Sequence, residues 1–243
     1  MPRKAPSCTI GGGVFLQHTR APTGGALSST TPIRAVVFDY GMVLTGPQDP
    51  EAHAMLMQLT GLPLDRFEKY YWADRLAYDE GKLTGLAFWQ KILAKAKLDL
   101  YPSAAEELSL WDARMWTTQN GDMLNWQQQL TKRGILTAIL SNIGDSVLEN
   151  MQREFTWLDR FDVLVWSYQL LMAKPDAAIF HHVLKQLGTK PEENLFIDDK
   201  TINVEAAEEL GMRGLVFTTP AQLRADLIAQ GLDAYLPLPN PTV

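Results

Sequence analysis

The stretch Phe38-Asp39-Tyr40-Gly41-Met42-Val43-Leu44 follows directly on the apolar, β-branched run Ile-Arg-Ala-Val-Val at residues 33–37. Such a run is typical of a buried strand. An aspartate at the end of a buried strand must be paired, bound to a metal or neutralised. Open α/β sheets bind their ligands just outside the carboxyl ends of the strands. Asp39 is therefore the first candidate for a functional carboxylate, although a strand-end aspartate that caps the next turn is about as frequent.

The composition restricts the class of protein. The chain has 243 residues, of which 46% are hydrophobic, and a formal net charge of −6. This length suits one large domain or a core with a small second domain, and the negative charge argues against nucleic acid or an anionic membrane as the partner. Cys8 is the sole cysteine, so no intramolecular disulfide is expected and a reducing, cytoplasmic location is predicted. No apolar run reaches the length of a transmembrane helix.

Residues 1–31 differ from the rest of the chain. They are rich in Gly, Pro, Ser and Thr and carry Arg3, Lys4 and Arg20 without any acid. Such a segment cannot bury enough surface to offset its chain entropy, so we predict a disordered N-terminal tail. An organellar transit peptide is the alternative.

Strand-like and helical patterns alternate along most of the chain. Strand-like runs occupy residues 33–38, 135–140, 162–166, 194–197 and 214–217, and helical patterns occupy 144–154, 175–187, 201–210 and 220–230. This alternation predicts an α/β fold with a doubly wound parallel sheet. The interval 48–118 is helical throughout, with amphipathic pieces at 51–59, 64–78, 86–96 and 104–116. We therefore predict an α/β core of residues 32–47 and 119–243 and an inserted all-helical cap of residues 48–118.

Polar motifs also follow other predicted strands. Ser141 and Asn142 end the second strand, where they could hold a phosphate oxygen or simply cap the next helix. Lys174 precedes Pro175 before the helix at 175–187, where it could pair with Asp39 or be merely solvated. The carboxyl ends of parallel strands meet at one edge of the sheet, so these side chains are expected to converge.

The run Leu195-Phe196-Ile197-Asp198-Asp199, followed by Asn203, is the fourth motif. Two adjacent carboxylates at a strand end repel each other strongly. A hard cation with oxygen ligands, above all Mg²⁺, would compensate that repulsion, and a salt bridge to Lys174 or Lys200 is the alternative.

Together, Asp39, Ser141, Lys174 and Asp198-Asp199 resemble the four motifs of the haloacid dehalogenase (HAD) superfamily, and the helical insertion matches the cap of its subfamily I. The stretches 78–84 and 198–207 are similar to the branch that holds sugar-phosphate phosphatases and the N-terminal domains of epoxide hydrolases. The resemblance implies a Mg²⁺-dependent phosphohydrolase in which Asp39 attacks phosphorus and becomes phosphorylated, with Lys174 as a second catalytic group.

The resemblance also implies the remaining roles. The implied phosphate-binding residues are Gly41, Met42, Ser141, Asn142 and Lys174. The implied Mg²⁺ ligands are Asp39, the Gly41 carbonyl and Asp199, with Asp198 and Asn203 acting directly or through water. The expected partner is a small phosphorylated metabolite, without nucleic acid or membrane, and the chain is expected to be a monomer or homodimer. Most aromatic side chains of the predicted cap, Trp116 among them, are expected to pack its core or to line an apolar pocket, and Tyr71 or Trp72 is the candidate to touch the substrate.

Gly41 departs from the family pattern, because most family phosphatases carry there an aspartate that protonates the leaving oxygen and then activates water. Such general acid–base help is worth about 10²–10⁴ in rate. The substrate then has a good leaving group, such as an anomeric or acyl phosphate, or another acid substitutes. The candidates for that acid are His53, Asp145, and Asp79 with Glu80.

Two alternatives to a phosphatase remain open. A metal-independent haloacid dehalogenase would tolerate Gly41, but it would carry neutral residues in place of Asp198 and Asp199. A non-catalytic phosphate-binding protein would have no use for the costly carboxylate cluster.

Overall fold

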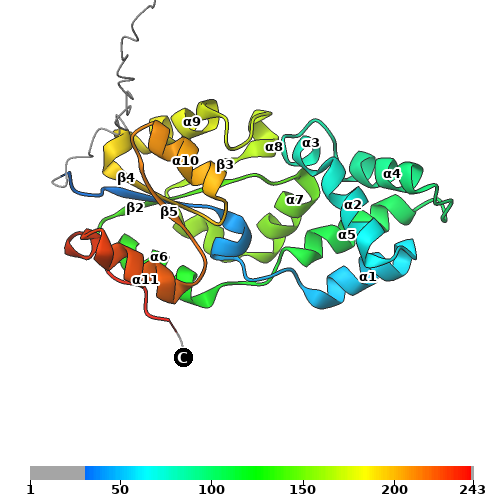
Figure 1. The fold of residues 1–243 in the computed structure, drawn as a ribbon, viewed down its shortest axis with the longest axis horizontal. Helices are drawn as coiled ribbons and strands as arrows, with labels where there is room; N and C mark the ends of the chain where they lie inside the picture. Colours follow the sequence, from blue (N-terminus) through cyan, green and yellow to red (C-terminus); the bar gives the residue numbers. More distant parts are fainter. Residues whose placement is uncertain (1–30, 242–243) are drawn as a thin grey trace, which may run out of the picture.

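The computed structural model describes residues 31–241, so the predicted tail and Cys8 lie outside the described residues. Its strands are β1 (Ala35–Phe38), β2 (Leu136–Ser141), β3 (Val163–Trp166), β4 (Asn194–Asp198) and β5 (Arg213–Val216). All pair in parallel in the order β3-β2-β1-β4-β5 (Figure 1). The predicted α/β fold is confirmed.

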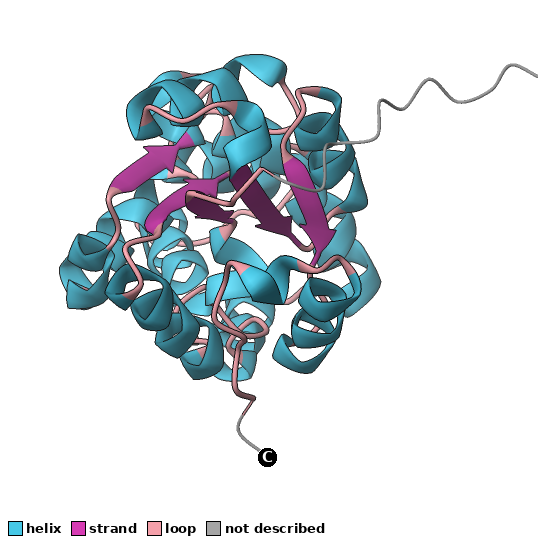
Figure 2. Cartoon of the chain, turned by 90° about the vertical axis from the view of Figure 1, so that its left-hand side faces the viewer, coloured by secondary structure: helices cyan, strands magenta, loops and turns pink. Residues whose placement is uncertain are grey.

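Helices cover both faces of the sheet, which explains the continuous apolar runs of its strands. Figure 2 shows the strands as a layer between helices. On one face lie α6 (Gly121–Lys132), α7 (Asp145–Glu154) and α11 (Pro220–Ala229), and on the other lie α8 (Ser167–Leu170), α9 (Ala177–Leu187) and α10 (Thr201–Glu209). Short 3₁₀ turns η2 (Thr156–Arg160), η3 (Pro191–Glu193) and η4 (Leu232–Ala234) complete this part.

The strand register aligns the ends of the three central strands. Phe38, the last residue of β1, pairs with Ile139 of β2 and with Ile197 of β4. Asp39, Ser141 and Asp198 therefore emerge at the same edge of the sheet, as the sequence predicts.

Five helices separate β1 from α6, in the interval predicted to be helical. They are α1 (Pro50–Thr60), α2 (Leu64–Ala73), α3 (Arg75–Asp79), α4 (Gly85–Ala96) and α5 (Ala104–Met115), and we call them the helical insert. Figure 1 places them beyond the end of β1. Their aromatic side chains form a separate core, in which Tyr78 stacks on Phe88 at 4.8 Å and Phe67 on Tyr71 at 5.6 Å between ring centroids.

Two narrow connections join the helical insert to the sheet domain. Thr45 and Gln119 form an isolated antiparallel bridge, and Asn120 N–H donates to Leu44 O at 3.0 Å. Further out, Asp49 N–H donates to Met115 O at 2.9 Å. The two chain segments that connect the insert to the sheet domain, residues 44–49 and 115–120, therefore lie side by side.

The helix predicted over 64–78 is two helices, because the chain breaks at Asp74, whose φ and ψ are −122° and 12°. The Asp74 carboxylate pairs with Lys91 at 2.9 Å and with Lys95, both on α4, so the break serves contacts between helices. Helix α6 was not predicted. None of the helices within residues 31–241 is both long and apolar enough to cross a bilayer.

Candidate active site

Asp39 emerges from β1 with one carboxylate oxygen already fixed. Its Oδ1 accepts a hydrogen bond from Tyr40 N–H at 2.7 Å and contacts Lys174 Nζ at 2.8 Å. Burial is the main cause that raises the pKa of Asp39, to about 7; Asp198 and Asp199 add to the rise and Lys174 opposes it. A carboxylate that is this unfavourable to ionise needs further positive charge in the site.

The turn after Asp39, η1 (Tyr40–Leu44), has a backbone that turns sharply into the site. Met42 lies in the left-handed region with φ of 61°, which is uncommon for a residue with a side chain. Its N–H donates to Thr45 Oγ1 at 2.9 Å, so this N–H is not free for the predicted phosphate contact. The Met42 side chain, 40% exposed, lines the cavity described below.

Lys174 lies between two buried carboxylates. Its Nζ is 2.8 Å from Asp39 Oδ1 and 2.6 Å from Asp198 Oδ2. Burial alone lowers the pKa of this ammonium, but the two carboxylates outweigh burial and raise it. Lys174 is therefore a fixed positive charge at the centre of the site.

Asp198 and Asp199 have different environments although they are adjacent. Asp198 is fully buried, and its oxygens accept from Lys174, from Lys200 N–H at 2.8 Å and from Asn203 Nδ2 at 3.0 and 3.1 Å. Asp199 faces the cavity, and within residues 31–241 no salt bridge engages it. Burial and the neighbouring Asp198 raise its pKa.

The donor set fits a hard divalent cation. Asp39, Asp198 and Asp199 each offer a carboxylate oxygen, and these oxygens lie within 4.8 Å of one another. Of the cations within residues 31–241, Lys174 is the one in salt-bridge contact with this cluster, so the three carboxylates exceed it in charge when they are ionised. Mg²⁺ prefers such oxygen ligands. Because Asp198 already accepts four hydrogen bonds, Asp39 and Asp199 are the better placed ligands.

Ser141 and Asn142, at the end of β2, have different roles in the site. Both line the cavity. The Asn142 side chain donates to Lys174 O at 2.9 Å and accepts from Lys174 N–H at 2.8 Å. The Asn142 amide therefore positions Lys174, and Ser141 is the hydroxyl available to a ligand.

A cavity of about 920 Å³ lies over these residues. All predicted site residues line it except Asp198, which lies beneath Lys174 and Asn203. Sequence analysis missed Arg75 and Leu76, which also line the cavity and carry no motif that marks them. Trp116, one of the aromatics of the predicted cap, lines it as well. Trp72 lines the cavity, whereas Tyr71 is buried in the helical insert.

Of the four candidate acids, two line the cavity and two do not. His53 and Asp79 line the cavity. Asp145 does not: its carboxylate accepts from Gly85 N–H at 2.8 Å and from Ser146 N–H at 2.7 Å, so it caps the start of α4. Glu80 pairs with Lys82 and is also absent from the lining.

Known proteins are similar to this chain in sequence. Residues 117–217 match the family model described as haloacid dehalogenase-like hydrolase. The chain is 28% identical to Phosphatase MT3486 of Mycobacterium tuberculosis over 200 residues, covering 81% of this chain and 92% of that protein. It is 34% identical to a sesquiterpene phosphatase of Aspergillus oryzae over 96 residues, covering 40% of this chain and 49% of that protein.

Among solved structures, a HAD family enzyme from Bacteroides thetaiotaomicron superposes with a TM-score of 0.66 at 22% identity, covering 77% of this chain and 94% of that one. A second structure of that enzyme contains magnesium and inorganic phosphate. Residues 117–217 thus match the haloacid dehalogenase-like hydrolases, and the chain is similar to a phosphatase over most of its length. It is an enzyme of the hydrolase class, and the resemblance read from its four motifs is confirmed.

Proposed function

We propose that the chain is a Mg²⁺-dependent phosphatase in which a phosphate ester transiently phosphorylates Asp39. The observation that carries this proposal is the convergence of Asp39, Ser141, Lys174 and Asp199 on one cavity. The phosphatase relatives support it, as does the Bacteroides enzyme that was solved with magnesium and phosphate. The helical insert would act as the predicted cap, residues 48–118, over the site.

In the proposed reaction each side chain has a defined part. Tyr40 N–H and Lys174 hold Asp39 Oδ1, which leaves Oδ2 to attack phosphorus. Lys174 and the Ser141 hydroxyl would stabilise charge on the phosphoryl oxygens. Mg²⁺ held by Asp39, Asp199 and the Gly41 carbonyl would supply further positive charge at the same oxygens. Asp198 and Asn203 would keep Lys174 in place.

The cavity walls support a substrate with a carbon-rich group. Met42, Leu76, Trp72 and Trp116 line the part that faces the helical insert. Apolar and aromatic walls favour an organic group larger than a few carbons, and one of the phosphatase relatives carries the name of a sesquiterpene phosphatase. The cytoplasmic location and the monomeric or homodimeric state stay predictions.

The test is phosphate release from a panel of phosphate esters, with and without Mg²⁺. We expect release to need Mg²⁺ and to vanish in Asp39→Asn, while Asp65→Asn, an exposed carboxylate on α2, stays active. Circular dichroism checks that both variants fold. Release that persists in Asp39→Asn would exclude Asp39 as the nucleophile, and chloride release from 2-chloropropionate without metal would favour a dehalogenase.

A further inference from the structure

The space above Gly41 is filled from the helical insert. A Cβ atom added to Gly41 would lie 4.0 Å from Cζ3 of Trp116, so the indole ring covers the side of the turn where a longer side chain would extend. Tyr40 fixes this arrangement, because its hydroxyl donates to Trp116 O at 2.6 Å. The residues packed around Trp116 therefore lie where a substitute proton donor would be needed.

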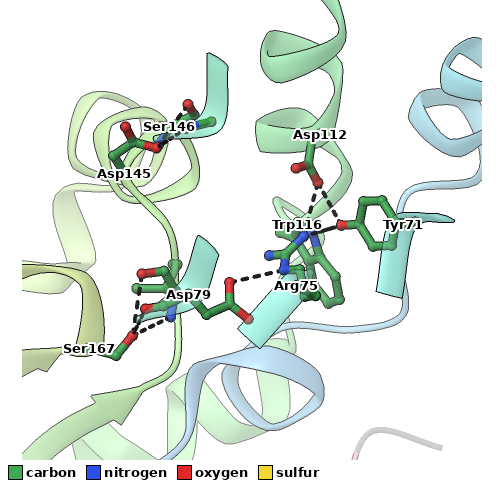
Figure 3. Close-up of polar contacts among 10 residues, drawn as sticks. Tyr71, Arg75, Asp79, Asp112, Trp116, Asp145, Ser146 and Ser167 are labelled. Carbon is green, nitrogen blue, oxygen red and sulfur yellow. Dashed lines mark hydrogen bonds and ion pairs between the residues drawn. The ribbon is translucent and has the colours of Figure 1, made fainter. Parts of the chain in front are cut away.

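Arg75 connects Trp116 to an acid. Its guanidinium carbon lies 5.3 Å from the centre of the Trp116 ring, and its Nε donates to Asp79 Oδ1 at 2.9 Å. On its other side Arg75 Nη1 contacts Asp112 Oδ1 at 3.3 Å and the Tyr71 hydroxyl. Figure 3 shows Arg75 between these groups, with one Asp79 oxygen directed at it.

Hydrogen bonds hold both the backbone and the side chain of Asp79. The Ser167 hydroxyl, at the start of α8 in the sheet domain, donates to the backbone carbonyl of Asp79 (Figure 3). Arg75 holds Oδ1, and among residues 31–241 no hydrogen bond engages Oδ2. Asp79 lines the same cavity as Asp39 and Lys174. One carboxyl oxygen is thus held still while the other is available to a ligand.

We propose that Asp79 donates the proton to the leaving oxygen of the substrate and so takes the part that Gly41 cannot play. This inference rests on the proposed phosphatase function. Asp39 attacks phosphorus, the P–O ester bond breaks with its electron pair on the leaving oxygen, and the carboxyl proton of Asp79 completes the alcohol. Water then attacks phosphorus of phospho-Asp39 and gives a proton to the Asp79 carboxylate. The P–O bond to Asp39 breaks with its electron pair on the Asp39 oxygen, which releases phosphate and restores both residues.

The charges around Asp79 suit this cycle. Burial is the main cause that raises its pKa to about 6, with Arg75 and more weakly Lys200 opposing the rise and Asp112 adding to it. A general acid works best with a pKa near the working pH. His53 is the competing donor in the cavity, but its ring nitrogen already lies 3.4 Å from Glu68 on α2.

The experiment compares leaving groups. Wild type, Asp79→Asn and the matched control Glu80→Gln are assayed with p-nitrophenyl phosphate, phenyl phosphate and an alkyl phosphate. We expect Asp79→Asn to lose about 10²–10⁴ in kcat/KM with the alkyl phosphate and little with p-nitrophenyl phosphate, whose leaving group needs no proton. The ratio kcat/KM is the measure because it reports phosphorylation of Asp39, whereas hydrolysis of phospho-Asp39 is common to all esters and should slow equally. In wild type we expect kcat/KM with the alkyl phosphate to decline as pH rises above about 6, and Asp79→Asn should lose this decline.

Three outcomes would overturn the proposal. Equal losses in kcat/KM with all esters would reduce Asp79 to a positioning residue, and an unchanged kcat/KM for the alkyl phosphate would remove it from the phosphorylation step. The same leaving-group pattern in His53→Gln, with Asp79→Asn unaffected, would assign the proton to His53. Wild type that hydrolyses no ester would instead refute the proposed phosphatase itself. Thermal melting of each variant checks that the Arg75 cluster remains folded.

Discussion

Lys174 is the residue on which the charge balance of the site depends, because it contacts both Asp39 and Asp198 in the interior. In Lys174→Met these carboxylates lose their common partner. Removing one partner of a buried pair typically destabilises a protein by about 3–5 kcal/mol. We expect urea unfolding without divalent cations to show a loss of that size at pH 8, whereas Lys185→Met, an exposed lysine on α9, should change little.

The pH dependence of this loss has a defined sign. Without the ammonium, the pKa of Asp39 rises further above the value of about 7 that it has with Lys174 present. An acid whose folded pKa is raised costs stability increasingly as pH rises from the unfolded pKa of about 3.9 to the folded pKa, and above the folded pKa the cost is constant. In Lys174→Met this range extends further above pH 7 than in wild type. The deficit of Lys174→Met should therefore be smaller at pH 5 than at pH 8. A deficit that grows on acidification would contradict the assignment.

For individual residues, the sequence predicted which ones end strands but not the contacts between their side chains. Asp39, Ser141 and Asp199 follow apolar runs, so their convergence could be predicted from a parallel sheet alone. The bonds from the Asn142 amide to the Lys174 backbone could not, since they join residues 32 positions apart. The stack of Arg75 on Trp116 also depends on tertiary packing that no local pattern encodes.

Among the elements, the contacts of α4 and α5 with α7 fix the helical insert on the sheet domain. Gly85, at the start of α4, donates to Asp145, at the start of α7, and the hydroxyls of Ser109 and Ser146 lie 2.8 Å apart. A Cβ atom on Gly144 would lie 2.1 Å from Cζ of Tyr78. This junction therefore leaves no space for a side chain at Gly144.

Gly144→Ala tests the junction. The φ and ψ of Gly144, −82° and 169°, suit alanine, so backbone strain does not contribute and any loss of stability comes from the clash with Tyr78. Such overpacking typically destabilises by about 1–3 kcal/mol. We expect a lower melting temperature and a lower kcat/KM, because the helical insert is displaced from the cavity. Gly121→Ala, which has no atom within 4 Å of the added Cβ, is the matched control and should show neither change.

The element order was predictable because hydrophobic period and turn residues agree along the sheet domain. All five strands lie within a residue or two of their predicted runs. The prediction of one helix over 64–78 is wrong because of a tertiary contact. The helix ends at Asp74, whose carboxylate pairs with Lys91 and Lys95 of α4. Local propensity continues the helix across such a position, and only the packed structure ends it there.

For the molecule as a whole, metal binding should increase the free energy of unfolding. A ligand that binds only the folded state at 100 times its Kd adds about 2.7 kcal/mol. We expect Mg²⁺ to raise the melting temperature of wild type by roughly 5–10 °C at that ratio. Asp199→Asn should abolish this shift, while Asp159→Asn, an exposed carboxylate, should keep it. An undiminished shift in Asp199→Asn would place the cation elsewhere.

The cavity lies where the helical insert meets the sheet domain, so substrate choice should depend on the insert while chemistry depends on the strand ends. Trp72 tests this division, because its side chain lines the cavity yet is 47% exposed, and truncation should hardly affect stability. Loss of an aromatic contact of about 1.5 kcal/mol corresponds to roughly tenfold in kcat/KM. Trp72→Ala should show this decrease with an aryl or prenyl phosphate and almost none with acetyl phosphate. Ile228→Ala, with 48% exposure on α11, is the control and should alter neither rate. Equal losses with the large and the small substrate would mean that Trp72 acts on the reaction and does not select the organic group.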